Sequence, residues 1–147
     1  MIFKLRCLRA GGSFGDIMFE LVVFPPQTLL AALQALFALS IGHAIADFPL
    51  QGEFLATGKN RHFLIRMQDP CRPVSMWVVC MTVHCLIHAG AVWIITGSSL
   101  LGLVEFVLHW GVDVAKCEGK TTFNQDQALH ILCKAGYVGA AWSGCLS

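Results

Sequence analysis

The chain has few charged residues, and their distribution leaves long stretches without any. Only 13% of its 147 residues are Asp, Glu, Lys or Arg, about half the share of an average soluble domain. No charged residue lies between Glu20 and Asp47, between Arg72 and Glu105, or after Lys134. With 56% hydrophobic residues, this composition favours an integral membrane protein. A soluble bundle would need a polar face on the middle helices, which the sequence lacks.

The sequence also lacks a basic stripe for nucleic acid and closely spaced cysteine pairs. The net charge is only +1, and no basic stripe is interleaved with aromatic residues, so no nucleic acid partner is expected. The seven cysteines include no C-x-x-C pair, and four of them fall within apolar segments, where free cysteine behaves as a small apolar residue. No structural disulfide is therefore expected.

The uncharged stretches predict an all-α integral membrane bundle of about four transmembrane helices. A spanning helix needs about 20 mostly apolar residues, so the first stretch fits one helix. The second stretch is too long for one helix and contains the turn signal Thr96-Gly97-Ser98-Ser99. The expected helices cover residues 28–46, 74–95, 100–115 and 125–142. They form one domain over residues 28–147, after an N-terminal extension over residues 1–27 that is interfacial or disordered.

The basic residues indicate an orientation in the membrane. Two connections are basic, and they carry Lys59, Arg61, Arg66 and Arg72 before the second helix and Lys116 and Lys120 after the third. The positive-inside bias places both connections in the cytoplasm and both termini outside. Lys4, Arg6 and Arg9 in the extension favour the opposite orientation, unless the extension lies flat on the membrane surface.

Polar residues recur at a spacing of four within the apolar segments. Five of the six histidines and three of the five aspartates form four pairs, each in a different expected helix. The pairs are His43/Asp47, His84/His88, His109/Asp113 and Asp126/His130. Residues i and i+4 lie on the same face of a helix, so each helix presents two polar side chains in one direction. Polar groups this costly to bury in lipid indicate a function.

The pairs also agree in depth along the bundle. At a rise of about 1.5 Å per residue from the Gly97 turn, His88 and His109 differ by about one helical turn. His84 and Asp113 differ by a similar amount, and the other two pairs lie toward the basic connections. All four pairs are therefore expected in the same half of the bundle, the cytoplasmic half.

Imidazole and carboxylate groups on four facing helices are how a helix bundle builds a metal centre. We therefore expect all eight paired residues to be metal ligands, and the cofactor to be a divalent zinc, manganese or iron ion. Structural roles stay open for single residues: Asp47 ends the first helix, Asp126 caps the fourth, and His84 and His88 bond between helices. Glu105 extends the stripe of the third helix and pairs with a histidine or binds the metal.

The motifs together resemble a known family. They are His43-x-x-x-Asp47-Phe-x-Leu-Gln51, His109-x-x-x-Asp113-x-x-Lys116 and Asp126-Gln127-x-x-His130, in this order. The chain resembles, over about residues 29–145, the bacterial and phage membrane proteins grouped as domain of unknown function 3307. The resemblance implies a small multi-spanning protein of the bacterial inner membrane. The chain departs from the pattern in its extension and in Trp110-Gly111, where close helix packing is expected to compensate for the glycine.

The histidine and aspartate layout also resembles, more loosely, membrane-bound proteins grouped as metal-dependent hydrolases. By this likeness the chain is expected to hydrolyse a lipid or lipid-linked phosphate, with Asp47 and Asp113 in catalytic roles and Lys116 at an anionic headgroup. Gln51 and Gln127 are candidate hydrogen-bond partners. The expected partners are the lipid bilayer and a lipid substrate, and the sequence leaves homo-oligomerisation open.

Other functions fit the same residues. Intramembrane carboxylates and histidines also mark the ion path of a divalent-metal or proton-coupled transporter. A bis-histidine haem bundle does not need the accompanying aspartates, and the clustered histidine boxes of membrane di-iron desaturases are absent. A membrane accessory protein with a structural polar network is the non-enzymatic alternative.

Overall fold

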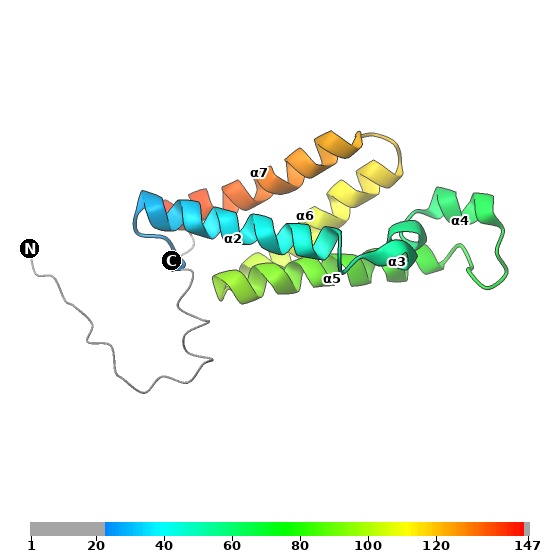
Figure 1. Cartoon of the computed structure of the whole chain (residues 1–147), viewed down its shortest axis with the longest axis horizontal. Helices are drawn as coiled ribbons and strands as arrows, with labels where there is room; N and C mark the ends of the chain where they lie inside the picture. Colours follow the sequence, from blue (N-terminus) through cyan, green and yellow to red (C-terminus); the bar gives the residue numbers. More distant parts are fainter. Residues whose placement is uncertain (1–22, 146–147) are drawn as a thin grey trace, which may run out of the picture.

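The computed structural model describes residues 23–145, and all of the regular secondary structure in this range is helical. Four long helices lie side by side in a bundle (Figure 1). They are α2 (Leu29–Asp47), α5 (Met76–Thr96), α6 (Ser99–Cys117) and α7 (Phe123–Trp142). Each end lies within two residues of its expected position, which confirms the four expected helices. Most of the extension predicted over residues 1–27 falls in residues 1–22, outside the described residues.

The connection between α2 and α5 is more ordered than the sequence suggested. It contains two short helices, α3 (Gly52–Gly58) and α4 (Arg61–Met67), at the end of the bundle where α6 connects to α7 (Figure 1). α3 packs closely on α5, because a Cβ atom at Gly58 would lie only 2.6 Å from Cys80 Sγ. This close approach brings the following residue, Lys59, into the bundle, where it is buried.

Side-chain caps define where the helices begin. Thr28 and Ser98 each accept a hydrogen bond from the backbone N–H three residues later, and Gly97 ends α5 in the left-handed region with a φ of 69°. Thr122 and Gln125 form a capping box at the start of α7. The N-cap of α7 is therefore Thr122, so the suggestion that Asp126 caps this helix was wrong.

The bundle has apolar side chains on its outer surface. Large hydrophobic residues are exposed on all four long helices, among them Phe37, Val79, Leu103 and Leu132. Within the described residues, two helices are long and apolar enough to cross a membrane, α2 and α5. α6 and α7 carry charged residues in their middle turns, so length and composition alone do not mark them as spans.

The interior divides into two layers along the bundle. The layer near the Gly97 turn is apolar and is formed by residues from all four long helices, which are Ala32, Ala35, Leu39, Val92, Leu101, Tyr137 and Val138. Here Gly102 lets α6 approach α5, since a Cβ atom would lie 3.0 Å from the Ala89 carbonyl oxygen.

Gly111, further along α6, has no such role, because a Cβ atom there would meet nothing within 4 Å. The expected close packing at Gly111 was therefore wrong.

Candidate metal centre

The second layer is polar and contains all eight paired residues. His43 and Asp47 come from α2, His84 and His88 from α5, His109 and Asp113 from α6, and Asp126 and His130 from α7. All eight are buried, and Asp47 has the largest exposed fraction, 8%. The i, i+4 spacing that aligns each pair on one helix face thus directs all eight side chains into one interior region.

One group of ligand atoms surrounds His84 Nε2. His109 Nε2 and Asp113 Oδ2 each lie 3.2 Å from this nitrogen, and Asp47 Oδ1 lies 3.5 Å from it. Four ligands held tetrahedrally at about 2.0–2.1 Å from a zinc ion would be about 3.3–3.4 Å apart. The atoms of His84, His109 and Asp113 all lie within 4.8 Å of one another and can therefore share one metal ion, and Asp47 adjoins them at His84.

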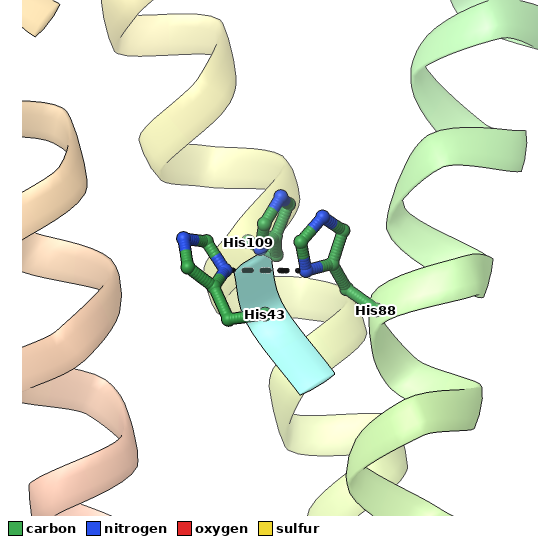
Figure 2. A group of neighbouring side chains, drawn as sticks. All are labelled: His43, His88 and His109. Carbon is green, nitrogen blue, oxygen red and sulfur yellow. Dashed lines mark hydrogen bonds between the residues drawn. The ribbon is translucent and has the colours of Figure 1, made fainter. Parts of the chain in front are cut away.

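Three histidines, His43, His88 and His109, cluster next to this group and share His109 with it (Figure 2). His43 Nδ1 lies 3.3 Å from His88 Nδ1, and the rings of His88 and His109 stack with their centroids 3.7 Å apart. The Gln127 amide donates to Asp47 Oδ2 through Nε2, so its carbonyl oxygen accepts from His43 Nε2 at 3.3 Å. This chain of bonds leaves the lone pair of His43 Nδ1 facing inward as a potential ligand.

A second group is formed by Asp113, Asp126 and His130. His130 Nε2 lies 3.6 Å from Asp113 Oδ1 and 3.6 Å from Asp126 Oδ1. All three atoms are buried and have no hydrogen-bond partner among the described residues. Buried polar atoms are rarely left unpaired, so an ion or a water molecule is the natural partner for this group.

Two lysines bind the other oxygens of the same aspartates. Lys59 Nζ donates to Asp113 Oδ2 at 2.5 Å and also to Gln51 Oε1 at 2.7 Å. Lys116 Nζ donates to Asp126 Oδ2 at 2.7 Å and lies over the Phe123 ring. Each lysine thereby orients a carboxylate and holds its Oδ1 toward His130.

A third set of polar residues separates this centre from the apolar layer. Glu105 Oε1 lies 3.1 Å from His109 Nδ1 and accepts from Lys134 Nζ at 2.5 Å, while Oε2 accepts from the Tyr137 hydroxyl at 2.7 Å. A carboxylate on the outer nitrogen of a histidine sets the tautomer of the ring and leaves the other nitrogen free for metal. Glu105 therefore pairs with a histidine, one of the two roles that the sequence left open.

A cavity of about 250 Å³ lies beside the polar layer at the end of the bundle that carries α3 and α4. Its lining residues are Lys59, Arg61, Trp77, Met81, Val114, Cys117, Glu118 and Lys120. Lys59 belongs to both the cavity wall and the cluster, through its contact with Asp113. At the rim, a hydrogen bond from Arg61 lowers the pKa of the half-buried Glu118, which also contacts His62 Nε2 at 3.2 Å.

Some residues of the centre are not among the sequence-predicted ligands. Lys59 looked like a charge in a basic loop, and its burial depends on the close packing of α3 against α5. Lys134 and Tyr137 were not singled out, although Asp126, His130 and Lys134 continue the four-residue spacing along α7. That continuation of the stripe is the sequence signal that would have identified Lys134.

The residues present fit a divalent metal ion. Within the described residues, four overlapping groups bring ligand atoms within 4.8 Å of one another. They are His43/His88/His109, Asp47/His84/His88, His84/His109/Asp113 and Asp113/Asp126/His130. Buried nitrogen and oxygen atoms without partners, together with neutral imidazole and carboxylate donors, are the features of such a site.

Comparison with known proteins assigns the chain to a family. A search of the curated proteins and a search of the solved structures found no match. The model of a family described as "Protein of unknown function (DUF3307)" matches residues 35–138. This range begins within α2, ends within α7 and contains all eight paired residues. Because the match covers well over half of its length, the chain belongs to the DUF3307 family.

Proposed function

We propose that this protein is a membrane-embedded, metal-dependent hydrolase of a lipid or lipid-linked phosphate. The observation that carries the proposal is the convergence of His84 Nε2, His109 Nε2, Asp113 Oδ2 and Asp47 Oδ1, with neighbouring separations of 3.2–3.5 Å about His84. The cavity at Lys59 supports a hydrolase, since its lining combines three basic side chains and one acidic side chain, Glu118, with apolar walls next to the centre. An amphiphilic phosphate ester carries the complementary negative charge together with an apolar surface.

A divalent ion held by these residues would activate water and offset the charge of the phosphate. Asp47 is the proposed general base, because it is the most exposed of the eight residues and Gln127 holds its Oδ2. Water attacks the phosphorus and gives its proton to Asp47, the bond between phosphorus and the lipid oxygen breaks, and the departing oxygen takes a proton from solvent. Asp113 is a metal ligand, and Lys59 and Lys116 are the proposed contacts of the phosphate oxygens.

The apolar outer surface supports a bundle in which all four long helices cross the membrane. Polar groups inside and large hydrophobic side chains outside are what lipid requires of a spanning protein. The bacterial inner membrane is the proposed location. The basic residues of α3, α4 and the α6–α7 connection support a cytoplasmic position for the cavity.

The test is metal analysis combined with a hydrolysis assay. The full chain is purified in detergent without chelators, its zinc, manganese and iron are measured by mass spectrometry, and phosphate release is followed from phosphatidate and from a polyprenyl phosphate in mixed micelles. Stoichiometric metal and metal-dependent phosphate release are expected. Both are expected to disappear in His84→Ala.

His62→Ala is the matched control. His62 is an exposed histidine that contacts Glu118 at the rim and lies outside the polar layer, so this variant should keep its metal and its activity. A wild-type chain without bound metal would contradict the proposal. Metal that stays bound in His84→Ala but is lost in His62→Ala would contradict the proposed location.

A divalent-metal transporter is the second candidate. It is favoured by the enclosure of the ligands, all of which are 0–8% exposed, since a carrier must occlude its cargo between helices. Proteoliposomes containing a metal-sensitive dye distinguish the two functions. Influx that depends on His84, without phosphate release from any lipid phosphate, would support transport and exclude the hydrolase.

A further inference from the structure

Asp113 lies between two separate groups of candidate ligands. Its Oδ2 is 3.2 Å from His84 Nε2 and 3.9 Å from His109 Nε2, whereas its Oδ1 is 3.6 Å from His130 Nε2. The two oxygens of this single carboxylate therefore point to ligands from different helices, α5 and α6 on one side and α7 on the other.

The overlaps among the four groups define two positions. The first three groups share their histidines pairwise: His88 occurs in two of them, and so do His84 and His109. These three groups describe alternative ligand sets around one region. The fourth group, formed with Asp126 and His130, shares only Asp113 with those three groups.

From this geometry we propose that the protein holds two divalent cations bridged by Asp113. The first cation is bound by His84 Nε2, His109 Nε2 and Asp113 Oδ2, with Asp47 beside it as the general base. The second is bound by Asp113 Oδ1, Asp126 Oδ1 and His130 Nε2. This inference rests on the metal centre of the proposed function and adds a second ion to it.

Three buried atoms without hydrogen-bond partners among the described residues support the second cation. Lys59 and Lys116 each donate one hydrogen bond to Oδ2 of Asp113 and Asp126, and both Oδ1 atoms have no donor among the described residues. The separations of 3.6 Å from His130 Nε2 are too long for hydrogen bonds and are close to the spacing of neighbouring ligands on one ion. The two lysines thus orient Asp113 and Asp126 so that both Oδ1 atoms lie near His130 Nε2.

The two positions favour different cations. The first is rich in imidazole, which suits zinc or iron, while the second has two carboxylate oxygens and one imidazole, which suits manganese or magnesium. Charge supports an anionic substrate between them. Four buried carboxylates (Asp47, Glu105, Asp113 and Asp126) face three lysines (Lys59, Lys116 and Lys134), so two divalent ions would leave three positive charges. A phosphate dianion would reduce this excess to one.

The experiment is a manganese titration of the full chain in detergent. Bound Mn²⁺ per chain is counted by mass spectrometry, and electron paramagnetic resonance reports whether neighbouring ions are spin-coupled. The wild type is expected to bind two Mn²⁺ with a coupled signal. Asp126→Asn/His130→Ala should bind one with the six-line signal of an isolated ion, and His62→Ala should match the wild type.

The outcomes separate this inference from the proposed function. One uncoupled ion in the wild type, unchanged in Asp126→Asn/His130→Ala, would overturn the second position and leave a single-metal hydrolase intact. No bound ion at all would overturn both, with water filling the gap at His130. Circular dichroism of each variant shows whether its helices remain formed, and Asp126→Glu, which keeps the carboxylate, should retain two ions if Asp126 acts as a ligand.

Discussion

The apolar layer and the polar layer are built from the same four helices, yet they differ in nearly every contact. Near the Gly97 turn, Leu39, Val92 and Leu101 pack without polar partners. About two helical turns further along α2, α5 and α6, the interior consists of histidines and aspartates joined by hydrogen bonds and ion pairs. Glu105 and Lys134 lie at the boundary between them.

The two layers are expected to contribute differently to the stability and the metal binding of the protein. Apolar packing needs only suitable volume, whereas each buried polar atom needs a partner with the correct geometry. Several atoms of the polar layer lack such a partner within residues 23–145, among them His88 Nε2 and Asp126 Oδ1. The apolar layer is therefore expected to set the stability of the bundle, and the polar layer to set its metal affinity.

The largest expected effect comes from Asp113→Asn. Asp113 is the one residue shared by the two proposed cation positions, so the metal affinity should fall by more than the roughly 10–100-fold typical of outer-shell changes. Isothermal titration with Mn²⁺ measures this loss. Glu53→Gln, which removes an exposed carboxylate of α3, is the control. Equal affinities of the two variants would refute a central role for Asp113.

Lys134→Met should produce the largest loss of stability. It leaves Glu105 buried with only Tyr137 and His109 as partners, and removal of one partner from a buried ion pair costs roughly 3–5 kcal/mol. Thermal unfolding in detergent, followed by circular dichroism, measures the effect. The double variant Glu105→Gln/Lys134→Met should recover part of the loss, since no unpaired charge remains. A double variant less stable than Lys134→Met would contradict this explanation.

Leu39→Ala separates the two layers directly. Leu39 is 1% exposed in the apolar layer, and truncation of a buried leucine typically costs about 2–5 kcal/mol. The unfolding temperature should drop, while Mn²⁺ binding below that temperature should match the wild type. A parallel loss of metal affinity would show that the layers are coupled.

The smallest expected effects come from two glycines on α6. Gly102→Ala should destabilise the bundle by about 1–3 kcal/mol, because its Cβ atom would press on the Ala89 carbonyl oxygen. Gly111→Ala should be neutral or stabilising by up to about 1 kcal/mol, because the new methyl group meets no atom within 4 Å. The unfolding temperatures of the two variants, measured side by side, test whether α6 packs too closely on α5 at Gly102 to accept a methyl group. Equal shifts would argue against it.

Local patterns in the sequence were enough for the helices and for the composition of the polar layer. Uncharged stretches and the Gly97 turn placed the four long helices within two residues of their ends. The i, i+4 pairs identified eight residues that lie together in the interior. α3 and α4 were not foreseen, because helices of seven residues carry too few apolar positions for a clear periodicity.

The sequence by itself therefore determined which residues occupy one face of each helix, since 3.6 residues per turn aligns positions four apart. Only the tertiary structure decided how those faces meet. The approach of α3 to α5 brought Lys59 onto Asp113, and the packing of α7 against α6 brought Lys134 onto Glu105 and His130 toward Asp113. These contacts join residues 17 to 54 positions apart, and their geometry depends on helix packing that no local pattern encodes.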